Sequence, residues 1–181
     1  IFSESARVDK KDLAMVKAFP ATQPIENFEV GRLVSGFGTR INPFHKGNYH
    51  HDGVDISASR GSKILAGGDG NVSMIKRSDL LAGFGNYIEI DHGFGYITRY
   101  AHLEEITVRL GQKINAGHVI GTVGTSGGAI APHLHYEIIR DGKNLNTINF
   151  ILEGLNSSSM LLFLFKFHPG IPCFQRDLPE M

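Results

Sequence analysis

Glycine separates short apolar runs throughout the middle of this chain, which has 22 glycines among 181 residues. Between about residues 33 and 139 the runs are only a few residues long, and glycine clusters such as those at 67–70 and 115–117 lie between them. Short β-branched and aromatic runs with turn residues at close spacing are typical of antiparallel sandwiches and barrels. The sequence therefore predicts a mainly β fold, an antiparallel β-sandwich or barrel-like domain with a short N-terminal helix. The expected strands are residues 63–66, 71–75, 87–91, 96–102, 119–123 and 133–139.

The composition divides the chain into three segments. Residues 1–32 are predicted to be an N-terminal helix and connector, because 5–18 carry a partial apolar stripe and two prolines then end any helix. Residues 33–152 are the β domain, and 153–181 form a C-terminal tail to which the sequence assigns no role. The tail contains an apolar run at 160–167, which is far shorter than the roughly 20 residues that a membrane-spanning helix needs.

Charge and cysteine content exclude several classes of protein. The 18 basic and 18 acidic residues cancel, so the chain has no basic surface of the kind that binds nucleic acid or anionic membranes. The one cysteine, Cys173, rules out an intrachain disulfide framework and a closed thiolate metal site. From the balanced charge we expect no nucleic-acid partner.

Two histidines are spaced for joint action on one face of a strand. His133 and His135 lie two apart in a strand-like segment, so their imidazoles share a face with Cα atoms roughly 6–7 Å apart. One of them could bind a metal while the other stands beside it. Two surface histidines on a strand are the alternative interpretation.

His51 and Asp55 form a second candidate pair, four residues apart. On a straight strand their Cα atoms would be roughly 13 Å apart, which is near the limit for binding one ion. Gly53 between them permits a bend or a close backbone approach. Two histidines and a carboxylate can hold one zinc ion and leave its fourth position open, the arrangement of catalytic sites. The alternative is a glycine turn in which Asp55 caps a backbone amide.

The order of these and other motifs carries a resemblance to a known family. The matching residues are Ser35-Gly36-Phe37-Gly38-Thr39-Arg40-Ile41-Asn42-Pro43, His51-x-Gly53-x-Asp55, Gly85-Asn86-Tyr87-Ile88, Tyr100-Ala101-His102-Leu103, Gly111-Gln112, Gly121-x-Val123-Gly124-x-Ser126-Gly127 and His133-Leu134-His135-Tyr136-Glu137. The segment from about 34 to 150 resembles the LytM/lysostaphin-type zinc metallo-endopeptidases, which cut peptide bonds in bacterial cell walls. The resemblance covers roughly two thirds of the chain and identifies residues 33–152 as a domain of this type.

The resemblance implies roles for five residues. His51, Asp55 and His135 would hold Zn²⁺ with a water molecule in the fourth position, and His133 would be the general base. His102 would be a second active-site histidine, able to stabilise a developing oxyanion. A histidine base suits a chain without a His-Glu-x-x-His motif, because histidine titrates near neutral pH. For His102 the alternative is a strand-end histidine bonded to a carbonyl group.

Three further residues are predicted to contact substrate. Alternation along residues 96–102 places Tyr100 and His102 on one face, toward the cleft. Ser126 belongs to a glycine-rich segment that we expect to form a flexible wall of the groove. Arg40 either lines the cleft and binds a substrate carboxylate or serves as a structural ion-pair partner.

The remaining histidines are predicted to have no part in the site. His50 neighbours a ligand but points to the opposite side of an extended segment, although an exchange of roles with His51 stays open. The other four are expected in turns or on the surface. They are His45, His92, His118 and His168.

The function predicted from the resemblance is hydrolysis of peptide cross-links in peptidoglycan, between D-alanine and a diamino acid rather than in a glycine bridge. The expected location is the periplasm, the cell envelope or outside the cell, with a membrane anchor or coiled coil upstream of this chain. The alternative is a non-catalytic peptidoglycan-binding module that activates other wall hydrolases. Residues 108–121 also resemble half of a lipoyl or biotinyl carrier motif, but the lysine that such carriers need at a hairpin tip is missing. The sequence gives no prediction of the oligomeric state.

Overall fold

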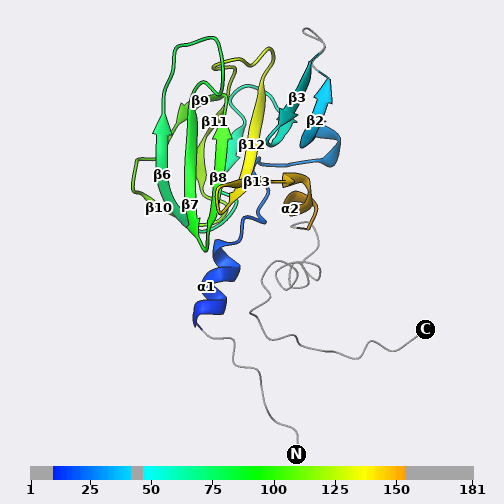
Figure 1. The fold of residues 1–181 in the computed structure, drawn as a ribbon. Helices are drawn as coiled ribbons and strands as arrows, with labels where there is room; N and C mark the ends of the chain where they lie inside the picture. Colours follow the sequence, from blue (N-terminus) through cyan, green and yellow to red (C-terminus); the bar gives the residue numbers. More distant parts are fainter. Residues whose placement is uncertain (1–9, 42–46, 154–181) are drawn as a thin grey trace, which may run out of the picture.

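The computed structural model of the protein describes residues 10–41 and 47–153 (Figure 1). Residues 5–9 of the expected helix, the 154–181 part of the tail, and two of the histidines assigned to turns or surface, His45 and His168, lie outside the described residues.

A large antiparallel sheet forms the main layer. Its strands follow the order β1-β4-β12-β8-β7-β6-β10, and β13 pairs with β12. Each of these pairs is antiparallel. The strands are β1 (Leu33–Ser35), β4 (Val54–Ser57), β6 (Gly70–Lys76), β7 (Tyr87–Gly93), β8 (Tyr96–Ala101), β10 (Lys113–Ile114), β12 (His133–Arg140) and β13 (Lys143–Leu145).

A smaller sheet of three strands covers one face of the large sheet (Figure 1). It has the order β5-β11-β9, with bounds Lys63–Leu65, Val119–Val123 and Leu103–Ile106. Its inward side chains, such as Ile64 and Ile120, belong to one apolar cluster with side chains of the large sheet. The predicted antiparallel β architecture is confirmed, and the strand bounds agree with the predicted ones to within a residue or two.

Strand β12 shows how the sequence divides the two faces of the large sheet. Leu134, Tyr136 and Ile138 have no exposed surface and belong to the apolar core. His133 and His135 alternate with them and therefore lie on the opposite face. Because a shift of one residue would exchange the two sets, burial of the apolar side chains fixes the register of the histidines.

A two-stranded sheet lies beside β12 (Figure 1), and its last residue, His51, contacts His135 of β12. It consists of β2 (Gly38–Ile41) and β3 (Asn48–His51), which pair antiparallel with Gly38 opposite His51. The last residue of β3 is therefore held against the large sheet by a separate hairpin.

Two helices and the connector complete the described part of the chain. Helix α1 (Lys10–Ala18) lies within the predicted helical range, whereas α2 (Thr147–Glu153) was not predicted. A short 3-10 turn, η1 (Val30–Arg32), precedes β1. The connector joins the core through Phe19, whose ring stacks on Phe150 with centroids 5.3 Å apart. Within the described residues, no helix has the length and apolar character required to cross a membrane.

His92 is a buried residue, and its assignment to a turn or the surface was wrong. It lies in β7 with 5% of its surface exposed. Its Nδ1 is 2.8 Å from the carbonyl oxygen of Asp69, and its Nε2 is 2.8 Å from the hydroxyl of Thr98. Burial lowers the pKa of His92 and outweighs the raising effect of the Asp69 carbonyl. The folded protein therefore favours the neutral form.

This burial predicts a pH dependence of stability. The pKa of His92 is lower in the folded chain than the roughly 6.5 of an unfolded histidine, so its stabilising contribution is complete above about pH 6.5 and is lost as the pH falls. In metal-free protein, we expect His92→Gln to lower the melting temperature at about pH 7.5 but to weaken its decrease toward about pH 5. Thermal unfolding of both proteins across this range is the measurement. Parallel pH profiles would contradict the assignment.

Candidate metal centre

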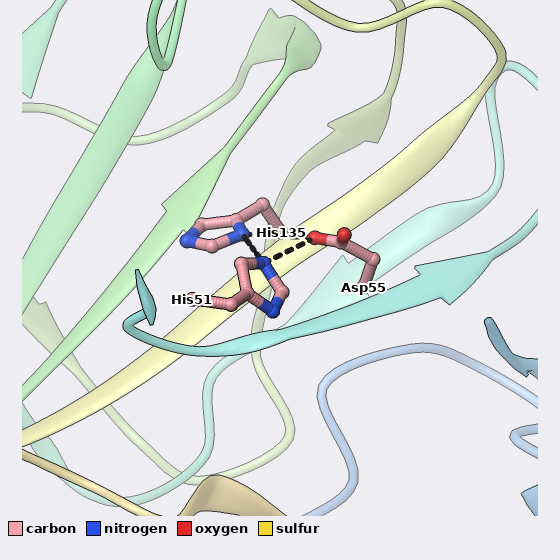
Figure 2. Close-up of side chains that lie close together, drawn as sticks. All are labelled: His51, Asp55 and His135. Carbon is pink, nitrogen blue, oxygen red and sulfur yellow. Dashed lines mark hydrogen bonds and ion pairs between the residues drawn. The ribbon is translucent and has the colours of Figure 1, made fainter. Parts of the chain in front are cut away.

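Three potential metal ligands meet beside β12 (Figure 2). His51 ends β3, Asp55 lies in β4, and His135 lies in β12 directly opposite Asp55 in the sheet. The Nε2 atom of His51 is 3.1 Å from Oδ1 of Asp55 and 3.0 Å from Nδ1 of His135. The distance from Nδ1 of His135 to the same carboxylate oxygen is 2.9 Å. Three ligand atoms thus converge on one point.

Gly53 allows the bend that brings His51 and Asp55 together. A Cβ atom at Gly53 would be 2.4 Å from the carbonyl oxygen of Tyr136, closer than any side chain can approach. Residues 52 and 53 separate β3 from β4, so the chain turns between the two ligands. The predicted close backbone approach at Gly53 is confirmed.

Hydrogen bonds on the far side of each imidazole determine which nitrogen faces the site. Nδ1 of His51 is 2.8 Å from the carbonyl oxygen of Gly36, and Nε2 of His135 is 2.9 Å from Oε1 of Glu137. A carbonyl or carboxylate oxygen only accepts hydrogen bonds, so these ring nitrogens carry the protons. In the neutral rings, Nε2 of His51 and Nδ1 of His135 therefore carry no proton. Each presents a lone pair toward the Asp55 carboxylate.

Three acceptors this close together repel one another unless a positive charge, either a metal ion or a proton, lies between them. The pKa directions express the same requirement. Burial raises the pKa of Asp55, but its close contacts with the imidazoles of His135 and His51, which can take up a proton, outweigh burial and hold that pKa well below its ordinary value. Burial lowers the pKa of His135, while Asp55 and Glu137 outweigh it and raise that pKa. The site attracts positive charge.

The ligand set fits zinc. Zinc binds imidazole nitrogen at about 2.0–2.1 Å and carboxylate oxygen at about 2.0–2.2 Å in tetrahedral geometry, which places ligands about 3.3 Å apart. The observed separations of 2.9–3.1 Å are within a few tenths of this value. Two nitrogens and one oxygen also leave a fourth position for water or substrate.

The three ligands lie in a cavity of about 690 Å³. Sequence reasoning missed several of its walls, including Tyr49 and Phe84. Tyr49 lies two residues before His51 on β3, so strand alternation could have placed it beside the ligand. The side chains and backbone that line the cavity are those of Val34, Arg40, Tyr49, His51, Asp55, Ser57, Gly83, Phe84, His102, Gly128, Ile130, Ala131, Pro132, His133 and His135.

Two further histidines line this cavity beside the ligands. The rings of His102 and His133 are 4.6 Å apart, and Nε2 of His133 is 3.8 Å from Oδ1 of Asp55. Nδ1 of His133 is 2.8 Å from the Ala131 carbonyl oxygen, and Nδ1 of His102 is 2.8 Å from that of Ser126. Each neutral ring therefore has an unprotonated Nε2. Burial lowers the pKa of His102 to about 4, against the raising effect of the Ser126 carbonyl.

His102 reaches the cavity by a backbone turn rather than by strand alternation. Strand β8 ends at Ala101, and His102 has a φ of 63°, in the left-handed region. The expectation that His102 and Tyr100 share a face was therefore wrong. Tyr100 has no exposed surface, and its hydroxyl oxygen is 2.8 Å from the Gly67 amide and 3.0 Å from the Thr98 hydroxyl. The predicted contact between Tyr100 and substrate is wrong, because this side chain lies in the core.

The other two predicted substrate contacts have identifiable positions. Arg40 lines the cavity, and its guanidinium donates hydrogen bonds to the Ser35 hydroxyl and to the Gly36 carbonyl that also holds His51. Ser126 holds His102 through its carbonyl and accepts a hydrogen bond from the Asn86 amide at its hydroxyl. Contact of either residue with substrate stays a prediction.

The structure also locates His50 and the glycine-rich segment that contains Ser126. His50 is exposed, lies outside the ligand group and contacts the Thr39 hydroxyl. Gly128 of this segment lines the cavity, so the segment forms part of the cavity wall. Close backbone packing holds it there, since a Cβ atom at Gly127 would be 2.3 Å from the Gly85 amide.

Comparison with known proteins agrees with this architecture and site. Residues 49–147 match the sequence model of Peptidase family M23. The peptidoglycan DD-endopeptidase ShyA of Vibrio cholerae is 39% identical over 118 residues, which are 65% of this chain and 27% of ShyA. The DD-carboxypeptidase/endopeptidase Mpg of Neisseria meningitidis is 35% identical over 128 residues, 71% of this chain and 29% of Mpg.

Solved structures give the same result. A zinc-containing peptidase from Vibrio cholerae superposes with a TM-score of 0.60 at 28% identity, over 69% of this chain and 39% of that one. The catalytic domain of the antimicrobial peptidase lysostaphin from Staphylococcus simulans gives a TM-score of 0.55 at 28% identity, over 64% of this chain and 87% of that one.

The fold and the histidine–aspartate–histidine site define a β-sheet metallopeptidase domain of the LytM type. The chain belongs to peptidase family M23. The chain spans only part of the length of its relatives. It covers 27% of ShyA, 29% of Mpg and 38% of an uncharacterized metalloprotease of Buchnera aphidicola.

The geometry predicts which substitutions remove metal binding. We expect His51→Ala and Asp55→Ala each to weaken Zn²⁺ binding by more than about 100-fold, beyond the 10–100-fold typical of residues outside the ligand shell. Competition with a chromophoric chelator measures the affinity. His50→Ala is the matched control, because this neighbouring imidazole lies outside the ligand group and should leave the affinity unchanged. Loss of binding in the control would reverse the assignment of the two histidines.

Proposed function

We propose that this chain is the catalytic domain of a zinc-dependent endopeptidase that hydrolyses peptide cross-links of bacterial peptidoglycan. The observation that carries the proposal is the convergence of lone pairs from His51, Asp55 and His135 in a cavity that also presents two unprotonated histidine nitrogens. The names of the relatives support the substrate, since ShyA is called a peptidoglycan DD-endopeptidase. A substrate in the wall implies a location in the periplasm, the cell envelope or outside the cell.

His51, Asp55 and His135 would hold the zinc ion. A zinc ion in this position supplies Lewis acidity, which polarises a peptide carbonyl and lowers the pKa of water toward 7. His133 would act as the general base, because its Nε2 is unprotonated in the neutral ring and faces Asp55 at 3.8 Å. The Ala131 carbonyl holds the opposite nitrogen of this ring and so fixes its direction.

His102 would assist beside the base. Its lowered pKa of about 4 keeps the ring neutral at physiological pH, and its one N–H is directed to Ser126. In this state Nε2 can accept a hydrogen bond from water or from a substrate amide. Stabilisation of an oxyanion, the role first expected for His102, requires that this nitrogen first take up a proton.

The cross-link that we propose is the direct one between D-alanine and a diamino acid. Two relatives carry the designation DD-endopeptidase or DD-carboxypeptidase/endopeptidase, and this supports a direct bond over a glycine bridge. Arg40 at the rim of the cavity is the candidate for binding a substrate carboxylate, and Ser126 is proposed as part of the groove.

Mass spectrometry of muropeptides tests the proposed function. The zinc-loaded protein is incubated with isolated peptidoglycan sacculi that contain direct cross-links, and in parallel with walls that contain glycine bridges. We expect conversion of directly cross-linked dimers to monomers, with loss of the reaction in the presence of a chelator. Cleavage of glycine bridges alone would correct the substrate, and no conversion of either wall would favour the non-catalytic binding module.

His133→Ala separates the base from the ligands. We expect this substitution to lower the rate by about 10²–10⁴-fold, the usual contribution of a general base, while Zn²⁺ affinity stays close to that of the unmodified protein. The rate is measured on purified cross-linked dimers and the affinity by chelator competition. His118→Ala is the control, because this exposed histidine lies outside the cavity lining. Loss of the metal from His133→Ala would show that the roles are wrongly divided.

A further inference from the structure

A buried carboxylate stands behind the ligand His135. Glu137 lies two residues further along β12, on the same face, and its side chain is 1% exposed. Burial of an ionised carboxylate is strongly unfavourable unless hydrogen-bond donors and positive charge surround it. The donors around Glu137 therefore indicate what this side chain is held in place to do.

The two oxygens of Glu137 have different partners. Oε1 is 2.9 Å from Nε2 of His135. Oε2 accepts hydrogen bonds from the guanidinium of Arg99 at 2.8 Å and from the amide of Asn144 at 3.0 Å. Asn144 also donates to the carbonyl oxygen of Asp52, in the turn between β3 and β4, the two strands that carry the other two ligands. One oxygen thus faces the imidazole while the other is anchored to the protein.

Arg99 is itself held from several sides. Its guanidinium forms a second ion pair with Glu89 at 2.7 Å and lies over the rings of Phe84 and Tyr87, 5.0 Å and 5.6 Å from their centroids. The ring of Phe84 in turn packs on His135, with centroids 5.4 Å apart. Because the two rings and Glu137 also hold this guanidinium, loss of the Glu89 ion pair alone should leave it beside Glu137.

We propose that Glu137 is a positioning residue that sets the metal affinity of the site. By accepting the Nε2 proton of His135, it keeps the lone pair of that ring on Nδ1, directed at the ion, and Arg99 and Asn144 hold the carboxylate in the orientation this requires. The inference rests on the proposed zinc site and not on peptidase activity.

Chelator competition with Zn²⁺ alone, on the full chain, tests this role. In Glu137→Gln either the amide NH₂ faces His135 and favours a proton on Nδ1, or it faces Arg99 and Asn144, which offer only donors. We expect the Zn²⁺ affinity to fall by about 10–100-fold. Glu89→Gln is the matched control: it removes an ion pair from the same guanidinium without contact to a ligand, and the affinity should change by less than about twofold.

A second measurement separates positioning from general stability. In zinc-loaded unmodified protein, ¹⁵N NMR of the imidazoles should show His135 protonated at Nε2 and bound through Nδ1, and this signature should be lost or shifted in Glu137→Gln but kept in Glu89→Gln. If Glu137→Gln does not fold, Asn144→Ala, which releases one anchor of Oε2, should weaken Zn²⁺ binding in the same direction and by a smaller factor. Unchanged affinity in Glu137→Gln, or equal losses in Glu137→Gln and Glu89→Gln, would overturn the proposal. Because no peptidoglycan is used, failure of the proposed hydrolysis would leave this result standing.

Discussion

The site depends on a hydrogen bond to one ring nitrogen of each histidine that lines the cavity. His51, His102 and His133 direct Nδ1 to the backbone carbonyls of Gly36, Ser126 and Ala131, and His135 directs Nε2 to Glu137. In its neutral form, an imidazole held in this way carries its proton on the bonded nitrogen and leaves the other nitrogen free to face the cavity. Four free nitrogens consequently face one cavity beside a carboxylate, and together they can bind a cation and accept a proton.

The sheet architecture makes these hydrogen bonds possible. Burial of one face of β12 against the three-stranded sheet fixes its register, and so directs His133 and His135 to the other face. That face is then closed by the β2–β3 hairpin and by the 83–86 and 126–128 segments, whose backbones approach each other at Gly85 and Gly127. The stable core thus lies on one side of the sheet and the chemistry on the other, where the low exposure of the side chains strengthens electrostatic interactions.

Particular residues show where pattern reasoning succeeds and where it fails. Alternation correctly placed His133 and His135 together, because both lie within one regular strand. The same rule failed for Tyr100 and His102, because β8 ends at Ala101 and His102 itself has a left-handed backbone conformation, which takes its side chain off the face of Tyr100. His92 was misassigned for a related reason: the sequence Asp-His-Gly indicates a turn, whereas the strand continues through Gly93 and buries the ring against Thr98.

The sequence by itself determined the β architecture and the approximate strand bounds, which follow from glycine-separated apolar runs and the two-residue period of a strand. The chemistry of imidazole and carboxylate groups pointed to a metal site, and the resemblance to the LytM type gave His51, Asp55 and His135 as its candidate ligands. Only the tertiary structure decided that the ligand atoms lie about 3 Å apart, that Tyr100 belongs to the core, and that Glu137, Arg99 and Asn144 stand behind a ligand. The physical reason is that these contacts join strands up to about ninety residues apart, and strand pairing, which sets such distances, depends on how the whole core is packed.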